Sequence, residues 1–134
     1  MLKTAYITGA SAGLGAEFAR QLAARGYNLV LVARRLERLE TLAAELRQKH
    51  NVQAEALAAD LANGADVARL AERLAADKDL ALLVNNAGFG LGGPFVDSDV
   101  ERQLEMLEVH VSATMRLTRA ALPGMLARRS GNII

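Results

Sequence analysis

Three glycines, Gly9, Gly13 and Gly15, form the part of the sequence best suited to chemistry. They lie within residues 8–15, between the apolar run 5–7 and a helical pattern that continues to residue 23. The first amides of a helix lack intrahelical acceptors and lie at the positive end of its dipole, so an anion is favoured there. Glycines permit a tight turn and a close approach of backbone to the anion. The turn predicts a phosphate-binding site, with a plain strand-to-helix turn as the alternative.

Two arginines occupy the next informative position. A dinucleotide-binding unit that prefers NAD has an acidic residue about 20 residues after the glycine motif, where it binds the ribose 2′-hydroxyl. In this chain Arg34 and Arg35 lie there, directly after the apolar segment 28–33. Guanidinium groups pair with a 2′-phosphate, which NAD lacks. The spacing favours NADP(H), and a solvated helix start is the alternative.

Two further segments follow predicted strands and should reach the same edge of a sheet. Asp60 and Leu61 come after the segment 52–57, where the carboxylate could accept a hydrogen bond from an adenine amino group or cap the next turn. The spacing leaves both roles open. The sequence Asn-Asn-Ala-Gly at 85–88 follows an apolar strand, and its small residues would let backbone approach a cofactor. Residues 88–94 are rich in glycine and predict a mobile loop over a substrate.

Composition limits the class of protein. With 134 residues and 51% hydrophobic content, the chain can form one domain, 1–134, with a substantial core. A net charge of +1 without a long basic run argues against nucleic-acid and membrane partners. The chain has no cysteine and two separated histidines, so no metal site is expected. No signal peptide or membrane anchor is indicated, and the cytoplasm is the expected location.

Helical and extended patterns alternate along the chain, which is typical of an α/β fold. The strand at 52–57 alternates apolar and polar residues and should lie at a sheet edge, whereas 80–84 is continuously apolar and should be central. Helices are expected over 13–25, from residue 36 and around 67–74. Their predicted buried positions are Leu14, Phe18 and Leu22, then Leu36, Leu39, Leu42 and Leu46, then Val67, Leu70 and Leu74.

A long helix is predicted over 99–127, begun by a capping box of Ser98 and Glu101. Pro123 should kink or end it. Two of its faces are apolar, so we expect one to meet the domain and the other a partner subunit, giving a homodimer or homotetramer. The first face comprises Val100, Leu104, Leu107, Val111, Thr118, Leu122 and Met125, and the second comprises Met106, Val109, Ala113 and Ala120.

These motifs, in this order, resemble the N-terminal half of a short-chain dehydrogenase/reductase. The resemblance covers all 134 residues and implies a Rossmann-type, doubly wound parallel sheet of order 3-2-1-4-5. It also implies an NADP(H) site and hydride transfer between nicotinamide and a carbonyl or alcohol substrate. The implied cofactor residues are Gly9, Ser11, Gly13, Leu14 and Gly15 in the turn, Arg34 and Arg35 at the 2′-phosphate, Asp60 and Leu61 at the adenine, and Asn86, Ala87 and Gly88 at the ribose.

The chain departs from the family pattern in two respects. The family's catalytic serine and Tyr-x-x-x-Lys are missing, since Tyr6 precedes Ala10 by four residues and Tyr27 precedes Leu31. Because the sequence stops within an apolar strand, we expect a fragment that binds cofactor, is truncated at the start of strand five, and has those catalytic residues beyond Ile134. His110 stands where the family usually has a catalytic asparagine; it could relay protons or be a packed helix residue.

Two other functions fit parts of the sequence. Residues 9–13 match G-x-S-x-G, so Ser11 could be the nucleophile of a serine hydrolase, with Asp97 or Asp99 and His110 following in order. That reading leaves Gly15 and Arg34 unexplained. A nucleotide-binding module without catalysis is the second alternative. Phe89, Leu91 and Phe95 suggest a partly apolar substrate pocket, and no single substrate class is indicated.

Overall fold

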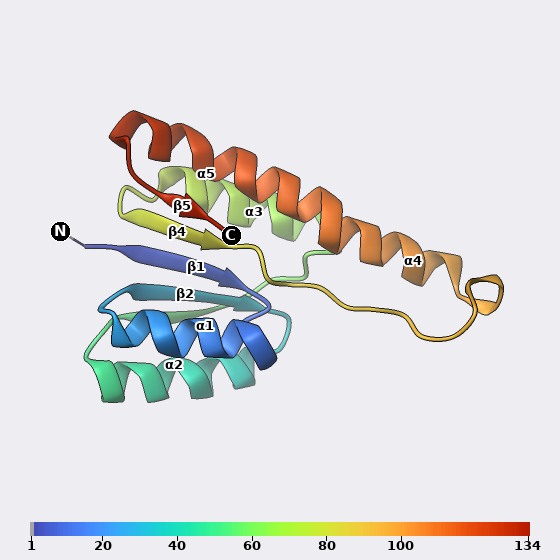
Figure 1. The fold of residues 1–134 in the computed structure, drawn as a ribbon, viewed down its shortest axis with the longest axis horizontal. Helices are drawn as coiled ribbons and strands as arrows, with labels where there is room; N and C mark the ends of the chain where they lie inside the picture. The colour runs from blue at the N-terminus through green and yellow to red at the C-terminus, as the bar shows by residue number, and fades with distance from the viewer. Residues whose placement is uncertain (1) are drawn as a thin grey trace.

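The computed structural model describes residues 2–134, which form a five-stranded parallel sheet of order β3-β2-β1-β4-β5 with helices on both faces (Figure 1). This confirms the predicted fold class and strand order. The strands are β1 (Thr4–Thr8), β2 (Asn28–Ala33), β3 (Ala54–Ala58), β4 (Leu80–Val84) and β5 (Asn132–Ile133). The helices are α1 (Gly13–Ala24), α2 (Leu36–His50), α3 (Gly64–Ala76), α4 (Val100–Leu107) and α5 (Thr114–Arg128), with a 3-10 turn η1 (Phe95–Asp97) and a π-helical segment η2 (Glu108–Ala113).

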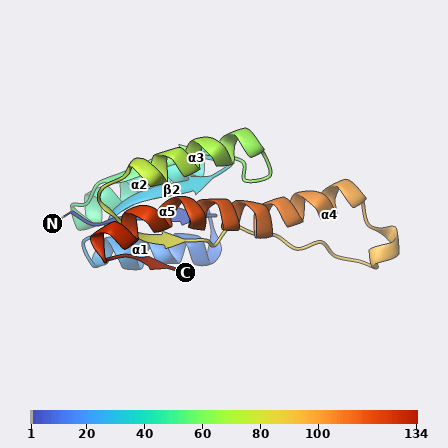
Figure 2. The same cartoon turned by 90° about the horizontal axis from the view of Figure 1, so that it is seen from above.

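The strands separate two apolar cores because successive side chains point to opposite faces of a sheet. Ala5 and Ile7 of β1 face α1 and α2, whereas Tyr6 faces α3 and α5 (Figure 1). Figure 2 shows α3 and α5 side by side over the second face. Both faces of β1 and β2 are buried, which explains their continuous apolar runs, and β3 lies at the edge as predicted.

The buried stripe of α1 differs from the prediction. Leu14 is 73% exposed and Phe18 is half-buried, while small residues contact the sheet. Leu14 lies in the first helical turn, beyond the strand end, so it has no sheet to pack against. Leu36, in the first turn of α2, is exposed for the same reason. The residues that α1 buries are Gly15, Ala16, Ala19, Leu22 and Ala23.

The segment after β4 also differs from the prediction. The cap of α4 is Asp99, whose Oδ1 accepts from the Glu101 amide at 3.0 Å, while Ser98 Oγ donates to the Phe95 carbonyl. The predicted single helix is α4, the π-helical η2 and α5 in one continuous rod (Figure 1). Pro123 lies inside α5, which continues to Arg128.

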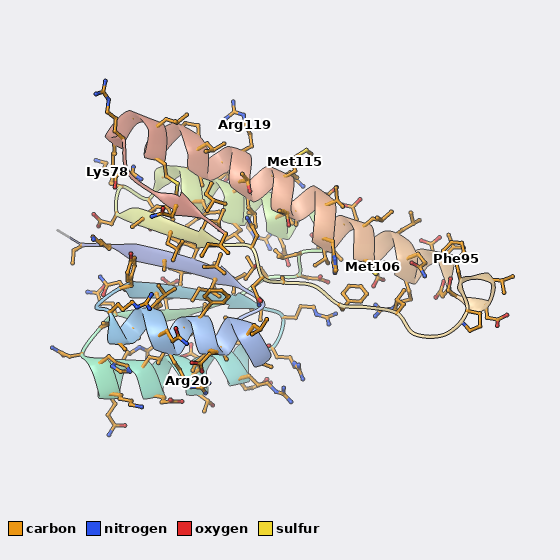
Figure 3. All side chains as sticks on the ribbon, in the orientation of Figure 1. Arg20, Lys78, Phe95, Met106, Met115 and Arg119 are labelled. Atoms are coloured by element: carbon orange, nitrogen blue, oxygen red, sulfur yellow. The ribbon has the colours of Figure 1, made fainter. Side chains whose placement is uncertain are left out.

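One apolar side of this rod is buried and the other is exposed. The second predicted face supplies the buried Val109 and Ala113, and the buried side continues with Leu117, Ala121 and Met125, although Met125 was predicted on the first face. Most of the first face is exposed, and Figure 3 shows Met115 and Arg119 on the side of the rod away from the sheet. The exposed apolar residues of the rod, which we call the outer face, are Val100, Leu104, Leu107, Val111, Met115, Leu122 and Leu126.

Candidate cofactor site

A hollow of about 780 Å³ lies at the edge where the carboxyl ends of β1, β2, β3 and β4 meet. Ligands of open parallel α/β sheets bind at this edge. Every predicted cofactor residue except Gly15 lines the hollow, although the residues come from separate parts of the chain. These lining residues are Gly9, Ser11, Gly13, Leu14, Arg34, Arg35, Asp60, Leu61, Asn86, Ala87 and Gly88.

The glycine turn has the geometry that its residues were predicted to provide. Gly9 and Gly13 have φ of +65° and +57°, a region that strongly favours glycine. A Cβ on Gly15 would lie 2.2 Å from the Gly9 carbonyl oxygen, so Gly15 allows α1 to pack against the turn. The α1 N-terminus has no side-chain cap and no acidic residue in its first turn, which leaves its amides open to an anion.

Thr8 joins this turn to the segment after β4. Its hydroxyl accepts from the amides of Asn86 and Ala87, both at 3.0 Å, and donates to the Val84 carbonyl at 3.3 Å. The Asn86 side-chain amide in turn donates to the Thr8 and Gly9 carbonyls at 3.1 and 3.2 Å. These bonds fix the two walls of the hollow relative to each other. The sequence did not single out Thr8 for this role, since a threonine ending a strand is common.

Arg34 and Arg35 follow β2 directly and line the hollow with exposed side chains. Within residues 2–134 neither guanidinium makes an ion pair. Arg35 occupies the cap position of α2 without forming a side-chain cap. Two unpaired cations near the amino end of a helix oppose its dipole, so an anionic ligand would stabilise this arrangement.

Of the two roles that the sequence left open for Asp60, the structure shows the capping of the turn. Its Oδ1 accepts from the Ala62 amide at 3.0 Å, which stabilises the turn after β3. Its own amide donates to Asp66 Oδ2 at 2.8 Å. Asp60 also lines the hollow, beside the buried Leu61. The carboxylate therefore caps the turn and keeps a second oxygen available to a ligand.

Residues 3–134 match the sequence profile of the family described as short chain dehydrogenase. The chain belongs to this family. Its strand order and the motifs at the strand ends agree with that membership.

Individual relatives are similar over nearly the whole chain. A very-long-chain 3-oxoacyl-CoA reductase of Aspergillus terreus is 42% identical, over 97% of this chain and 38% of its own length. Among solved structures, a short-chain dehydrogenase from Sphingobium yanoikuyae in complex with NADPH is 42% identical with a TM-score of 0.96, covering 98% of this chain and 52% of that one. A ketone-specific alcohol dehydrogenase from Comamonas testosteroni has the same TM-score, 38% identity, and coverage of 98% and 53%. The chain thus spans about two fifths to one half of these relatives.

His110 lies in the π-helical segment η2 and contacts the segment after β4. Its Nε2 accepts from the Phe89 amide at 2.9 Å, and the two rings meet edge to face with centroids 6.1 Å apart. A Cβ on Gly88 would lie 2.8 Å from Nε2, so a glycine is required there for this contact. No sequence pattern indicates the π-helical turn, because its residues are compatible with an ordinary helix.

The hydrolase alternative requires Ser11, His110 and an aspartate to be hydrogen-bonded in series. Within residues 2–134 no hydrogen bond joins any two of them. His110 Nε2 is engaged by Phe89, and Asp99 caps α4. Asp97 lies in η1, at the far end of the extended segment that leaves β4 (Figure 1). The structure therefore does not assemble this triad.

The α4 helix and the start of η2 contribute residues that the sequence did not predict for the site. Arg102, Glu105 and Val109 line the hollow together with Phe89. Their spacing of three and four places them on one side of the helix. Leu91 and Phe95, expected in a substrate pocket, do not line the hollow, and Phe95 is 78% exposed at the tip of the extended segment (Figure 3). Within residues 2–134 no helix could span a membrane and no acidic or histidine cluster could hold a metal.

Proposed function

We propose that this chain is the cofactor-binding part of an NADP(H)-dependent oxidoreductase. The observation that carries the proposal is the hollow that combines an uncapped helix N-terminus with the two unpaired guanidiniums of Arg34 and Arg35. A dinucleotide with a 2′-phosphate has anionic groups for both places. The NADPH complex of the Sphingobium relative, which shares the same fold, supports the choice of cofactor.

The fit of such a cofactor can be followed residue by residue. The glycine turn offers its amides to the pyrophosphate, and no atom would lie within 4 Å of a Cβ on Gly13, so the space before the turn is open. Arg34 and Arg35 would hold the 2′-phosphate, Asp60 would accept from the adenine amino group, and the segment 86–88 would border the ribose. When bound, the cofactor supplies or accepts the hydride.

The proposed reaction interconverts a carbonyl and an alcohol, the chemistry of the short-chain dehydrogenases. Phe89 gives the hollow an apolar surface beside Gly88, which suits an apolar part of the substrate. The 134 residues contain no Tyr-x-x-x-Lys to exchange the substrate proton, so we propose that the chain alone binds cofactor without turnover. His110 has Nδ1 left for a proton relay because Phe89 engages Nε2.

A nucleotide-binding module without catalysis remains the second candidate, because the same hollow supports it. It would bind NADPH and reduce no carbonyl even in its full-length form. The cytoplasmic location also stays a prediction.

We further propose that the outer face of α4–α5 contacts a second copy of the chain. Its exposed residues include Leu107, Val111 and Met115, which are spaced four residues apart and so lie on successive turns of one side of the rod. Large apolar side chains gathered on one face of a monomer usually mark a contact surface. The copy would join the rod to its equivalent, giving the expected homodimer or homotetramer.

The cofactor assignment is tested by titrating the protein with NADPH and with NADH, following nucleotide fluorescence. Replacement of Arg34 and Arg35 by alanine should weaken NADPH binding about tenfold to a hundredfold, the range of one or two charge-assisted hydrogen bonds, and should change NADH binding little. Arg38→Ala is the matched control, since Arg38 is an exposed residue of α2 that does not line the hollow. Equal affinity of the wild type for both nucleotides, or no binding of either, would reject the proposal.

A further inference from the structure

The α4 helix forms a further wall of the hollow, beside the glycine turn and the segment after β4, and it faces the turn after β3. Val109 and Leu61 belong to the same apolar cluster, and Phe89 packs against that cluster. Arg116 NH1 lies 3.4 Å from the Gly64 carbonyl oxygen, which joins the rod to the start of α3. The residues of α4 that precede Val109 therefore close the hollow at the end formed by Asp60 and its neighbours.

Arg102 is held on this wall in a defined orientation. Its guanidinium carbon lies over the Phe89 ring, 4.9 Å from the ring centroid, so the aromatic ring occupies one side of the guanidinium. Glu105, one turn further along α4, accepts a hydrogen bond from the same guanidinium. All three residues line the hollow, and the Arg102 side chain remains 44% exposed.

The pairing of Arg102 with Glu105 decides what kind of ligand group suits it. Among residues 2–134, Arg34 and Arg35 have no carboxylate partner, whereas the charge of Arg102 is already balanced by Glu105. A guanidinium that is already paired with a carboxylate gains less free energy from binding a phosphate than an unpaired one does. Its planar face can still stack on aromatic rings. Phe89 supports one face, so the other is the one that a ligand ring can cover.

We propose that Arg102 is a further binding residue of the site. Its guanidinium stacks between the Phe89 ring and the adenine ring of the bound cofactor. This inference rests on the proposed function, because it requires a nucleotide in the hollow. Asp60 on the opposite wall then contacts the edge of the base while Arg102 covers its face. Glu105 acts through Arg102 by fixing the plane of the guanidinium.

The test compares NADPH and NADH affinities of wild type, Arg102→Ala and Arg102→Lys. Both cofactors contain adenine, so the alanine variant should weaken both by the same factor, about fivefold to thirtyfold, as expected for a stacked guanidinium. Lysine keeps the charge without the planar face, so it should lose nearly as much as alanine. Glu105→Gln should give a smaller loss, also equal for the two cofactors.

Controls separate this inference from folding and from the proposed function. Arg119→Ala, on the side of α5 away from the sheet, should leave both affinities unchanged (Figure 3). The melting temperature of each variant, measured without nucleotide, shows whether the fold is intact. Phe89→Leu offers a second variant that removes the supporting ring and should weaken both cofactors.

The possible outcomes are distinct. Equal losses for both cofactors in the alanine and lysine variants support the stacking of Arg102. A loss of affinity confined to NADPH, with the lysine variant behaving as wild type, would assign Arg102 to the 2′-phosphate and overturn the stacking proposal. Affinities of the alanine variant within twofold of wild type would also overturn it. A wild-type protein that binds neither cofactor would overturn the proposed function and this inference together, before any variant is compared.

Discussion

Replacement of Thr8 by valine tests whether one buried hydroxyl aligns the two walls of the hollow. Valine keeps the shape and the methyl group of threonine, with a second methyl in place of the hydroxyl, but cannot accept a hydrogen bond. Thr8 is only 2% exposed, so no water can replace its hydroxyl without a local opening. The amides of Asn86 and Ala87, both 3.0 Å from Oγ1, would lose their shared acceptor.

The expected cost follows from these two amides. A buried donor left without a partner costs about 1–3 kcal/mol. Both amides belong to half-buried residues, so the low end of this range, about 1 kcal/mol, applies to each. For the two amides together we expect the free energy of unfolding to fall by about 2 kcal/mol. For a chain of 134 residues this corresponds to a fall in melting temperature of about 7 °C. NADPH affinity should fall as well, because the glycine turn and the segment 86–88 would no longer be aligned.

Urea unfolding and amide hydrogen exchange measure the two consequences separately. Exchange at Asn86 and Ala87 should accelerate in Thr8→Val more than exchange elsewhere in the sheet. Thr8→Ser, which keeps the hydroxyl, is the control and should retain slow exchange at both amides. If Thr8→Val unfolds within about 0.5 kcal/mol of wild type with unchanged exchange, the reasoning from unsatisfied amides is wrong.

Four further predictions concern other parts of the molecule. Gly15→Ala places a Cβ 2.2 Å from the Gly9 carbonyl oxygen, so it should destabilise the fold by about 1–3 kcal/mol and abolish NADPH binding. Gly92→Ala is the control, because no atom lies within 4 Å of a Cβ there, and it should change neither stability in urea melts nor affinity in NADPH titrations. Burial raises the pKa of Tyr6 to about 12, so the folded state favours the neutral phenol; stability should hold below about pH 10 and fall by roughly 2–3 kcal/mol between pH 10 and 12. In urea melts at pH 8 to 11, this part of the fall in the free energy of unfolding should be missing from Tyr6→Phe. Parallel curves of unfolding free energy against pH for the two proteins would exclude the effect. On the outer face, Leu107→Glu with Val111→Glu should convert an oligomer to a monomer in light scattering, and a wild type that is monomeric at micromolar concentration would reject the interface. In the full-length enzyme, His110→Asn should shift the pH dependence of the rate, and identical profiles would exclude a relay through His110.

The helix after β4 shows where sequence periodicity stops being informative. The pattern indicated two apolar faces, and both exist. Periodicity says that a face is apolar, but it does not say which face meets the sheet. The faces were decided by tertiary packing, in which Leu117, Ala121 and Met125 fill the space beside α3 and β4. The π-helical turn at His110 was equally invisible, because its residues are compatible with an ordinary helix.

The sequence by itself determined the alternation of strands and helices, the glycine turn and the two arginines after β2, and the order of the strands came from the resemblance to the family. These features depend on local rules: glycine allows positive φ at Gly9 and Gly13, apolar runs become buried parallel strands, and parallel strands bring their carboxyl ends to one edge. Only the tertiary structure placed Thr8 between two segments nearly 80 residues apart, and Arg102 on the far wall of the hollow. Such contacts join residues distant in the chain, and their geometry exists only once the sheet has formed.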